Sequence, residues 1–249
     1  MSQQLEQAAT LMGQASHLVA LTGAGISTPS GIPDFRSPNS GAWATADPMK
    51  VASIFAFKYN PQPFFDWIQP LTQLLLAARP NPAHLALAEL ERRGNLKAII
   101  TQNIDNLHGQ AGSMRVYELH GHLREATCQN CHQLVSTANL LPKFARDGQI
   151  PRCQCGGILK PNIILFGEQL PLSEFRAAEA AMRLADVVLI VGSSLEVSPA
   201  AELPTLALAN KAKIIIINYQ STHLDTHAEI VIRADVAEAL PQIVERLYG

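Results

Sequence analysis

His17-Leu-Val-Ala-Leu21, running directly into Thr22-Gly-Ala-Gly25, is the stretch that decides the expected fold of this 249-residue chain. A short apolar run that ends in a glycine-rich turn is typical of a strand buried on both faces. Apolar residues at helical spacing precede it, namely Leu5, Ala8, Met12 and Ala15. The stretch therefore predicts a helix, a buried strand and a loop in succession.

The same order repeats farther along the chain. Helical patterns cover residues 83–93, 173–185, 200–209 and 237–247, and buried apolar runs lie at 97–101, 187–191 and 214–217. Buried strands that alternate with helices predict a parallel sheet covered on both faces. We therefore expect an α/β fold with a Rossmann-like doubly wound parallel sheet, built from residues 1–31 together with 81–121 and 166–249.

Two segments interrupt this alternation. Residues 32–80 are rich in proline and aromatic residues, and we expect a helical insertion with a loop there. Residues 122–165 hold all the cysteines and predict a small inserted module. Because ligands of parallel sheets bind at the carboxyl ends of the strands, we expect a cleft between the sheet and these insertions.

The cysteines form two close pairs, Cys128 with Cys131 and Cys153 with Cys155. Four thiolates can close a tetrahedral zinc site that leaves no position for water, and such a site is structural. We therefore predict a zinc-ribbon module with one structural zinc ion, the alternative being four reduced surface thiols. His132 adjoins the cluster and is interpreted as a bystander.

Composition excludes several classes of function. Hydrophobic residues make up 47% of the chain, charged residues 16%, and the net charge is -2. These values favour a globular protein without an overall field that would attract nucleic acid or an anionic membrane. The apolar runs are shorter than the roughly 20 residues of a membrane span, and no secretory signal is recognisable. We expect a cytoplasmic monomer that binds neither membranes nor nucleic acid directly.

Gly23 and Gly25 suit a turn whose backbone approaches a pyrophosphate, although a tight turn alone would use the same residues. A dehydrogenase fingerprint would place a third glycine where this chain has Thr28, which disfavours hydride transfer. Polar residues also follow the next strands, in Thr101-Gln-Asn-Ile-Asp105, Gly192-Ser-Ser194 and Asn218-Tyr-Gln220. Each alone could cap a helix, but four such segments on one sheet edge predict a dinucleotide cleft.

These residues resemble the sirtuins of bacteria and archaea, a family of NAD-dependent protein-lysine deacylases. The resemblance spans nearly the whole chain and rests on Gly23-Ala-Gly-Ile-Ser27, Pro33-Asp-Phe-Arg36, Thr101-Gln-Asn-Ile-Asp105, Leu119-His-Gly121, the two cysteine pairs, Phe166-Gly-Glu168, Gly192-Ser-Ser-Leu-Glu-Val197 and Asn218. The family carries Thr where this chain has Ser193, a change that keeps the hydroxyl. The resemblance implies transfer of the acyl group of acyl-lysine to ADP-ribose, with release of nicotinamide and O-acetyl-ADP-ribose.

The resemblance also implies roles for individual residues. His120 would be the general base, and Asn103 and Asp105 would hold the nicotinamide amide, although a lone histidine is usually structural and the other two could cap a helix. The NAD-binding residues it implies are Gly23, Ala24, Gly25, Ile26, Asp34, Phe35, Arg36, Gln102, Asn103, Ile104, Asp105, Gly192, Ser193, Ser194, Asn218, Tyr219, Gln220 and Val236. For Asp34 and Arg36 the alternative is a solvated ion pair.

The partner implied by the resemblance is an extended acyl-lysine peptide of another protein. Its backbone would pair with two edges, one at Phe166, Gly167 and Glu168 and the other at Val197 and Ser198. Family members that prefer acidic acyl groups place Tyr and Arg on one helix at the positions of Ile68 and Leu71. An apolar pair cannot satisfy a carboxylate, so we expect uncharged acyl groups.

Two other functions remain open at this point: a protein mono-ADP-ribosyltransferase, and a non-catalytic module that binds NAD and zinc. A pure binding module has no need of His120, so this histidine favours catalysis.

Overall fold

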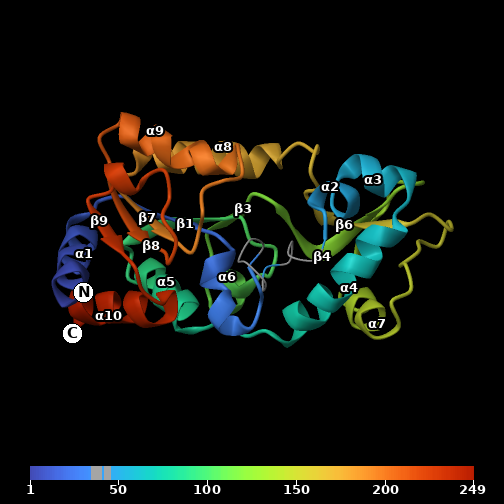
Figure 1. The fold of residues 1–249 in the computed structure, drawn as a ribbon, viewed down its shortest axis with the longest axis horizontal. Coiled ribbons are helices and arrows are strands. Elements are labelled where there is room, and N and C mark those ends of the chain that lie inside the picture. The colour runs from blue at the N-terminus through green and yellow to red at the C-terminus, as the bar shows by residue number, and fades with distance from the viewer. Residues whose placement is uncertain (35–40, 42–45) are drawn as a thin grey trace. The chain divides into compact units, whose positions relative to one another are not determined.

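The computed structural model describes residues 1–34, 41 and 46–249, and the chain divides into two compact units (Figure 1). Unit 1 comprises Met1–Ser30, Arg79–Leu119 and Leu172–Gly249, and unit 2 comprises Gly31–Ala78 and His120–Pro171. No helix in the described part of the chain is long and apolar enough to cross a membrane.

Unit 1 is built on a six-stranded sheet in the order β3-β2-β1-β7-β8-β9, in which every neighbouring pair is parallel. Its strands are β1 (Leu18–Thr22), β2 (Leu96–Thr101), β3 (Val116–Glu118), β7 (Val187–Val191), β8 (Lys213–Ile217) and β9 (Ile230–Ile232). Every residue of β1 and β7 is buried, as expected for strands covered on both faces. Thr22 pairs with Thr101 on one side and with Val191 on the other, so the carboxyl ends of these strands coincide.

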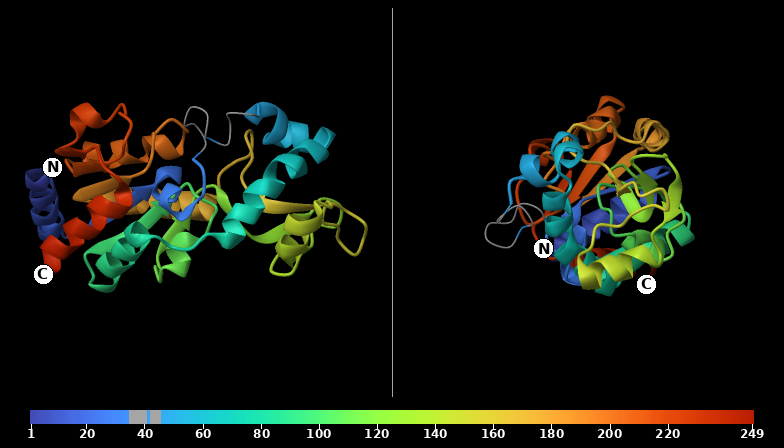
Figure 2. Two further views of the ribbon diagram at one scale, coloured as in Figure 1. Left: turned by 60° about the horizontal axis from the view of Figure 1, so that its bottom comes forward. Right: turned by 90° about the vertical axis from the view of Figure 1, so that its right-hand side faces the viewer.

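Helices cover both faces of this sheet (Figure 1). On one face α1 (Ser2–Gln14), α5 (Pro82–Arg92) and α10 (Val236–Tyr248) share a core with the strands, to which they contribute Met12, Leu87 and Leu240. The neighbouring helices α8 (Leu172–Leu184) and α9 (Leu203–Ala209) cover the other face. Helices α1 and α10 pack against each other, and the two chain ends lie at opposite ends of α1 (Figure 2). The predicted doubly wound α/β fold is confirmed.

Short helical turns connect these elements at the sheet edge. The helix α6 (Leu107–Gln110) follows β2, and the 3-10 turns η1 (Ala24–Ile26) and η2 (Thr28–Ser30) follow β1. Two further 3-10 turns, η3 (Ala200–Glu202) and η4 (Asp225–His227), precede α9 and β9.

Unit 2 combines helices with a three-stranded antiparallel sheet in the order β5-β4-β6. Its elements are α2 (Pro48–Val51), α3 (Ile54–Tyr59), α4 (Gln62–Ala77), β4 (Gly121–Cys128), β5 (Leu134–Ser136), α7 (Leu140–Asp147) and β6 (Leu159–Ile163). Phe57, Phe64 and Phe65 pack together, and the ring of Phe65 meets that of Phe144 at a centroid distance of 5.6 Å. Aromatic packing therefore joins α4 to α7 within this unit.

Candidate functional site

The ends of four neighbouring strands of unit 1, β2, β1, β7 and β8, carry the polar segments that the sequence singles out. Backbone hydrogen bonds tie these segments together just beyond the sheet: Gln102 N donates to Thr22 O (3.0 Å), Gly23 N to Val191 O (3.1 Å) and Gly192 N to Ile217 O (3.0 Å). The four segments therefore share one edge, the carboxyl edge of the sheet, where parallel α/β folds bind their ligands.

The glycine turn after β1 packs tightly against the loop after β7. A Cβ on Gly25 would lie 2.8 Å from the Cα of Gly192, and Gly192 has a positive φ of 61° that favours glycine. The N–H of Gly25 donates to the carbonyl of Gly192 (2.8 Å). Contact between two loops of the chain is thus enough to require these glycines, so their pattern alone does not indicate a phosphate site.

Asn103 and Asp105 are both buried and are linked through Ser27. The Asn103 amide donates to the Gly23 carbonyl (3.1 Å) and to Ser27 Oγ (3.2 Å), and the Ser27 hydroxyl donates to Asp105 Oδ2 (2.7 Å). The second carboxylate oxygen, Oδ1, accepts from the N–H of Leu107 (2.8 Å). The carboxyl group of Asp105 and the amide of Asn103 are therefore held in place where the loops after β1 and β2 meet.

The pKa of Asp105 is raised from its ordinary value because burial disfavours the charged form. The hydrogen bonds from Ser27 and Leu107 oppose this by favouring the carboxylate, and the nearby charge of Glu118 adds to the rise. Perturbed acids of this kind concentrate at functional sites.

The remaining segments form a polar rim along the same edge. Gln102 Nε2 donates to Ser193 Oγ (3.0 Å), which links the loop after β2 to the loop after β7. The Asn218 amide donates to the Gln220 carbonyl (2.9 Å), and Arg233 donates to the carbonyls of Asn218 and Gln220 (both 2.9 Å). The loop after β8 is therefore braced by Arg233, which the sequence analysis did not single out.

The other predicted NAD-binding residues of unit 1 differ in exposure. Ile26 and Val236 are buried, Ala24, Ile104 and Ser194 are half-buried, and Tyr219 and Gln220 are exposed. Val236 opens α10 and belongs to the core of unit 1. Asp34 is half-buried in unit 2, while Phe35 and Arg36 lie outside the described residues.

His120 is the first residue of the second segment of unit 2, His120–Pro171. Its carbonyl accepts from the N–H of Ile164 (2.9 Å), and its ring is half-buried. The preceding residue, Leu119, still belongs to unit 1, where its N–H donates to the Thr101 carbonyl (2.9 Å). The chain thus leaves the carboxyl edge of the sheet one residue before His120.

The segment Phe166-Gly-Glu168 is anchored within unit 2. Phe166 already uses both backbone groups, because its N–H donates to Ala52 O and its carbonyl accepts from Ile54 N (both 2.9 Å). The Glu168 carboxylate accepts from Leu165 N (2.8 Å) and from the buried ammonium of Lys160 (2.9 Å). The side chain of Glu168 therefore stabilises this edge through bonds within unit 2. The other predicted edge, at Val197 and Ser198, lies in unit 1, and Ser198 is exposed.

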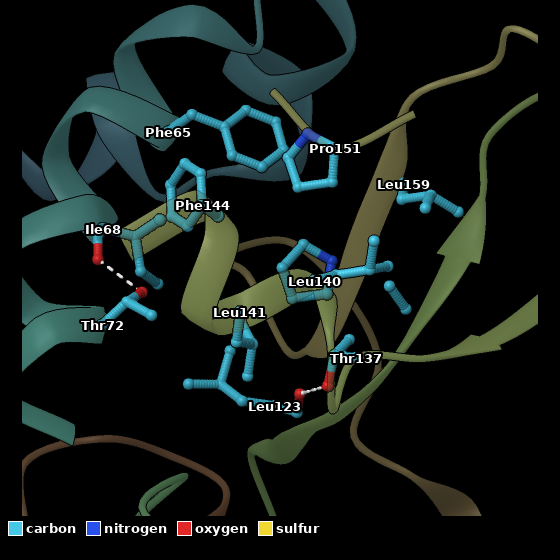
Figure 3. A pocket seen from close by; sticks show the side chains of 12 residues that line it. Phe65, Ile68, Thr72, Leu123, Thr137, Leu140, Leu141, Phe144, Pro151 and Leu159 are labelled. Carbon is cyan, nitrogen blue, oxygen red and sulfur yellow. Dashed lines mark hydrogen bonds between the residues drawn. The ribbon is translucent and has the colours of Figure 1, made fainter. Parts of the chain in front are cut away.

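Ile68 and Leu71 are both buried on α4, at 1% and 8% exposure. Ile68 lines a small cavity of unit 2 between α4, α7 and the three-stranded sheet (Figure 3). The lining is apolar apart from Thr72 and Thr137, whose hydroxyls donate to the carbonyls of Ile68 and Leu123. No unsatisfied polar group of the lining is available to bind a charged group.

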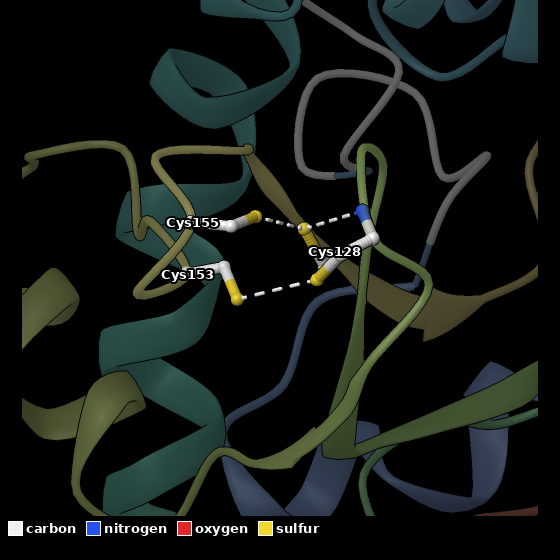
Figure 4. Close-up of side chains that lie close together, drawn as sticks. Cys128, Cys153 and Cys155 are labelled. Carbon is white, nitrogen blue, oxygen red and sulfur yellow. Dashed lines mark hydrogen bonds between the residues drawn. The ribbon is translucent and has the colours of Figure 1, made fainter.

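The four cysteines lie at one end of β4 and in the loop before β6 (Figure 4). Their sulfur atoms all lie within 4.8 Å of one another, with Cys128 Sγ 3.5 Å from Cys155 Sγ and Cys131 Sγ 3.7 Å from Cys153 Sγ. Thiolates about 2.3 Å from a tetrahedral zinc ion stand about 3.8 Å apart, so the cluster fits this metal. The four cysteines could therefore bind one structural zinc.

Backbone donors around the sulfur atoms favour thiolates as well. The N–H groups of Asn130 and Cys131 point to Cys128 Sγ at 3.4 and 3.5 Å. The N–H of Gly157 and the neighbouring thiols lower the pKa of Cys155 to about 6, while hydrogen bonds with the other thiols raise the pKa of Cys131, so Cys155 ionises first. A thiol that ionises readily is a better metal ligand.

Sequence reasoning left three structurally central residues out of the predicted site. Ser27 lies in a quoted motif but has no assigned role there, and Lys160 carries no signal. The histidines outside the motifs, His108 among them, are expected to be structural or exposed. Ser27 and Lys160 could have been suspected only from their partners, Asp105 and Glu168, which are distant in sequence. His108 is buried at 2% exposure.

Together these features define a parallel α/β protein with a polar edge that holds a buried acid, and with a separate four-cysteine module. The model of the Sir2 family matches residues 23–199. NAD-dependent protein deacetylase 1 of Pyrobaculum aerophilum is 45% identical, over 99% of this chain and 96% of that protein. NAD-dependent protein deacylase 2 of Archaeoglobus fulgidus is also 45% identical, over 99% and 97%.

Solved structures agree with these relatives. A structure described as the basis for the mechanism and regulation of Sir2 enzymes is 44% identical, with a TM-score of 0.93, and covers 99% of this chain and 98% of its own. Sir2Af2 bound to a myristoylated histone peptide is 40% identical, with a TM-score of 0.86, over 99% and 97%. The chain belongs to the Sir2 family.

Proposed function

We propose that this protein is an NAD-dependent protein-lysine deacylase, which transfers the acyl group of acyl-lysine to ADP-ribose and releases nicotinamide. The observation that carries the proposal is the buried Asn103–Ser27–Asp105 linkage at the carboxyl edge of the sheet. Relatives at 45% identity over the full chain are named NAD-dependent deacetylase and deacylase, which favours this function over mono-ADP-ribosylation or simple binding.

Asn103 and Asp105 are proposed to hold the nicotinamide amide. A carboxylate that accepts the amide N–H fixes the ring in the orientation from which it departs. The hydrogen bonds from Ser27 and Leu107 hold both oxygens of this carboxylate in place. The residues of the glycine turn, Gln102, Ser193 and Asn218 are proposed to hold the ribose and phosphate groups, Val236 to lie by the adenine, and Asp34, Phe35 and Arg36 to cover the reacting ribose.

His120 is the proposed general base. Nicotinamide leaves as the acyl carbonyl oxygen attacks the ribose carbon, and His120 then takes a proton from a ribose hydroxyl, which attacks the acyl carbon. Addition of water and departure of the lysine amine then leave the acyl group on the sugar. An imidazole suits this step because its ordinary pKa lies near neutral pH. The hydrogen bond from Leu119 to Thr101 supports a position of His120 next to the carboxyl edge.

The proposed partner is an extended acyl-lysine peptide, a chemistry represented among the relatives by the myristoylated histone peptide bound to Sir2Af2. Its backbone would lie along Phe166, Gly167 and Glu168 on one side, where Gly167 would supply the pairing because the backbone of Phe166 is already bonded to Ala52 and Ile54, and along Val197 and Ser198 on the other. We propose uncharged acyl groups, because the helix positions 68 and 71 carry apolar Ile and Leu. The proposed domains follow the sequence boundaries: the NAD-binding sheet, the insertion 32–80 and the zinc module 122–165.

Product analysis tests this function. The protein is incubated with NAD and an acetyl-lysine peptide, and the products are measured by mass spectrometry. We expect deacetylated peptide and O-acetyl-ADP-ribose in equal amounts, and neither from a His120→Tyr variant that still binds NAD. ADP-ribose attached to a protein acceptor, with the peptide still acetylated, would instead select the transferase.

A further inference from the structure

A second buried hydrogen-bond chain reaches the Asn103 loop from inside unit 1. His108 Nε2 and Thr22 Oγ1 lie 2.9 Å apart, and Thr22 Oγ1 donates to Thr101 Oγ1 (2.9 Å). Thr101 Oγ1 also accepts from the backbone N–H of Asn103 (3.1 Å). The chain therefore runs from an imidazole on α6, through the last residues of β1 and β2, to the loop that carries Asn103 and Asp105.

This chain and the Asn103–Ser27–Asp105 linkage close into a ring. Asp105 Oδ1 accepts from the N–H of Leu107, which is the neighbour of His108 on α6. Starting at His108, the ring passes through Thr22, Thr101, Asn103, Ser27 and Asp105 and returns to α6 at Leu107. A closed ring restrains each member from two sides, so the loop cannot shift without breaking a buried hydrogen bond.

The hydroxyl of Thr22 decides which group donates and which accepts in each hydrogen bond of this chain. Because Thr22 gives its proton to Thr101, its oxygen must accept from His108, and the proton of the neutral imidazole then sits on Nε2. The other ring nitrogen, Nδ1, is buried without a hydrogen-bond partner among the described residues, which fits a nitrogen that carries no proton. Burial lowers the pKa of His108 to about 3, so the ring stays neutral at physiological pH.

A purely structural role explains these residue types poorly. Thr22, Thr101 and His108 are 0%, 2% and 2% exposed, in a core where apolar residues of similar shape would pack without unsatisfied polar atoms. A buried polar atom without a partner costs about 1–3 kcal/mol. Such a cost is expected where orientation matters more than stability.

We propose that His108 is a positioning residue, which acts through the hydroxyls of Thr22 and Thr101 to hold Asn103 and Asp105 in the geometry that receives nicotinamide. The inference rests on the proposed function, because it assigns Asn103 and Asp105 to the nicotinamide end of NAD. It makes His108 and Thr22 determinants of nicotinamide departure that never touch the substrate.

Four variants separate positioning from packing. Thr22→Val removes the hydroxyl at nearly constant shape, and Thr22→Ser keeps it. His108→Gln places an amide nitrogen near the position of Nε2, whereas His108→Asn is too short to reach Thr22. Thr127→Val on β4 is the matched control, because it also removes a threonine hydroxyl that donates to another side chain, Asn162 Oδ1 (2.7 Å), and Thr127 has no place in the proposed site.

The measurements are kcat and KM for nicotinamide release with an acetyl-lysine peptide, inhibition by added nicotinamide, and binding of ADP-ribose, which lacks the nicotinamide. For Thr22→Val and His108→Asn we expect kcat to fall roughly tenfold, equal to about 1.4 kcal/mol, and nicotinamide to inhibit more weakly. ADP-ribose binding should stay within a factor of two or so of the wild type. Thr22→Ser and His108→Gln should restore kcat, and Thr127→Val should change only the melting temperature.

The possible failures are distinguishable. A wild type that releases no nicotinamide contradicts the proposed function and this inference with it. An active wild type whose Thr22→Val and His108→Asn variants behave like Thr127→Val overturns the inference alone, as does an equal loss of ADP-ribose binding. If Thr22→Val does not fold, the comparison of His108→Asn with His108→Gln gives the same decision.

Discussion

At the scale of single residues, the charge state of Asp105 depends on two donors. Burial raises its pKa, and the hydrogen bonds from Ser27 and Leu107 hold it down. Of these two donors only Ser27 is a side chain, so it is the one that a substitution can remove. Since the carboxylate is proposed to bind the nicotinamide amide, the pH dependence of turnover reports on this residue.

Ser27→Ala is expected to raise the pKa of Asp105 further, because the carboxylate loses a donor that favours the charged form. The acidic limb of the kcat/KM profile should therefore move to higher pH. The rate of nicotinamide release is measured at about ten pH values between pH 5 and pH 9. Ser113→Ala is the matched control, since its buried hydroxyl has no hydrogen-bond partner in the described structure. A uniform loss of rate with an unmoved acidic limb would contradict this assignment.

At the scale of elements, two buried histidines couple α5 to α6. The rings of His84 and His108 have centroids 5.0 Å apart, and burial lowers the pKa of His84 to about 4 and that of His108 to about 3. The unfolded chain binds protons at these rings near pH 6.5, where the folded chain cannot. Their contribution to stability is therefore complete above pH 6.5 and is lost as the pH falls toward 4 and below.

His84→Asn should flatten this acid dependence. Asn places an acceptor near the position of Nδ1, which accepts from the Asn81 N–H in the capping box of α5, but it does not titrate. The acid destabilisation attributable to His84, from the shift between 6.5 and about 4, is on the order of 3 kcal/mol below pH 4, and about 2 kcal/mol of it is expressed at pH 5. The melting temperatures at pH 7.5 and pH 5 should differ less in the variant than in the wild type. Each kcal/mol of stability corresponds to a shift of roughly 2–4 °C in the melting temperature. An unchanged difference would show that His84 is not the titrating group.

The elements of unit 1 could be predicted from the sequence because their signals are local. Buried strands such as β7 and amphipathic helices such as α5 repeat a fixed period, and each polar strand end follows directly in sequence. Helix α7 lay in a segment where no such alternation is visible. It is short, contains Pro142 and buries Phe144 and Ala145, and Phe144 packs on Phe65, which is distant in sequence.

The candidate site could likewise be predicted from the sequence only where its signals are local. The strand-end residues could be named from the sequence, but the ring through His108, Thr22 and Ser27 could not. It depends on hydrogen bonds between residues about 80 positions apart, such as those of Thr22 with Thr101 and His108. The glycines were expected where they lie, yet the structure attributes Gly25 to close packing against Gly192.

At the scale of the whole molecule, we expect the four-cysteine cluster to be the part of unit 2 that depends on a metal for its folding. Sheet β5-β4-β6 buries few large side chains around the cysteines, so coordination must supply much of its stability. Cys155→Ala or a strong chelator is therefore expected to remove one zinc ion per chain and to open residues 128–158 to proteolysis. Metal analysis and limited proteolysis measure both effects.

The neighbouring His132→Ala is the control, because it adjoins the cluster and lies outside the four ligands. It should keep the zinc ion and the resistance to proteolysis. Equal loss of zinc in His132→Ala, or a metal-free protein that remains fully protected, would contradict the four-cysteine site.

We expect the carboxyl edge of the sheet to break the bond between nicotinamide and ribose only when an acyl-lysine is present. Nicotinamide release from NAD by the wild-type protein, measured with and without an acetyl-lysine peptide, tests it most directly. We predict release that depends on the peptide and matches the amount of peptide deacetylated. Release at the same rate without peptide, or no release with it, would contradict the claim.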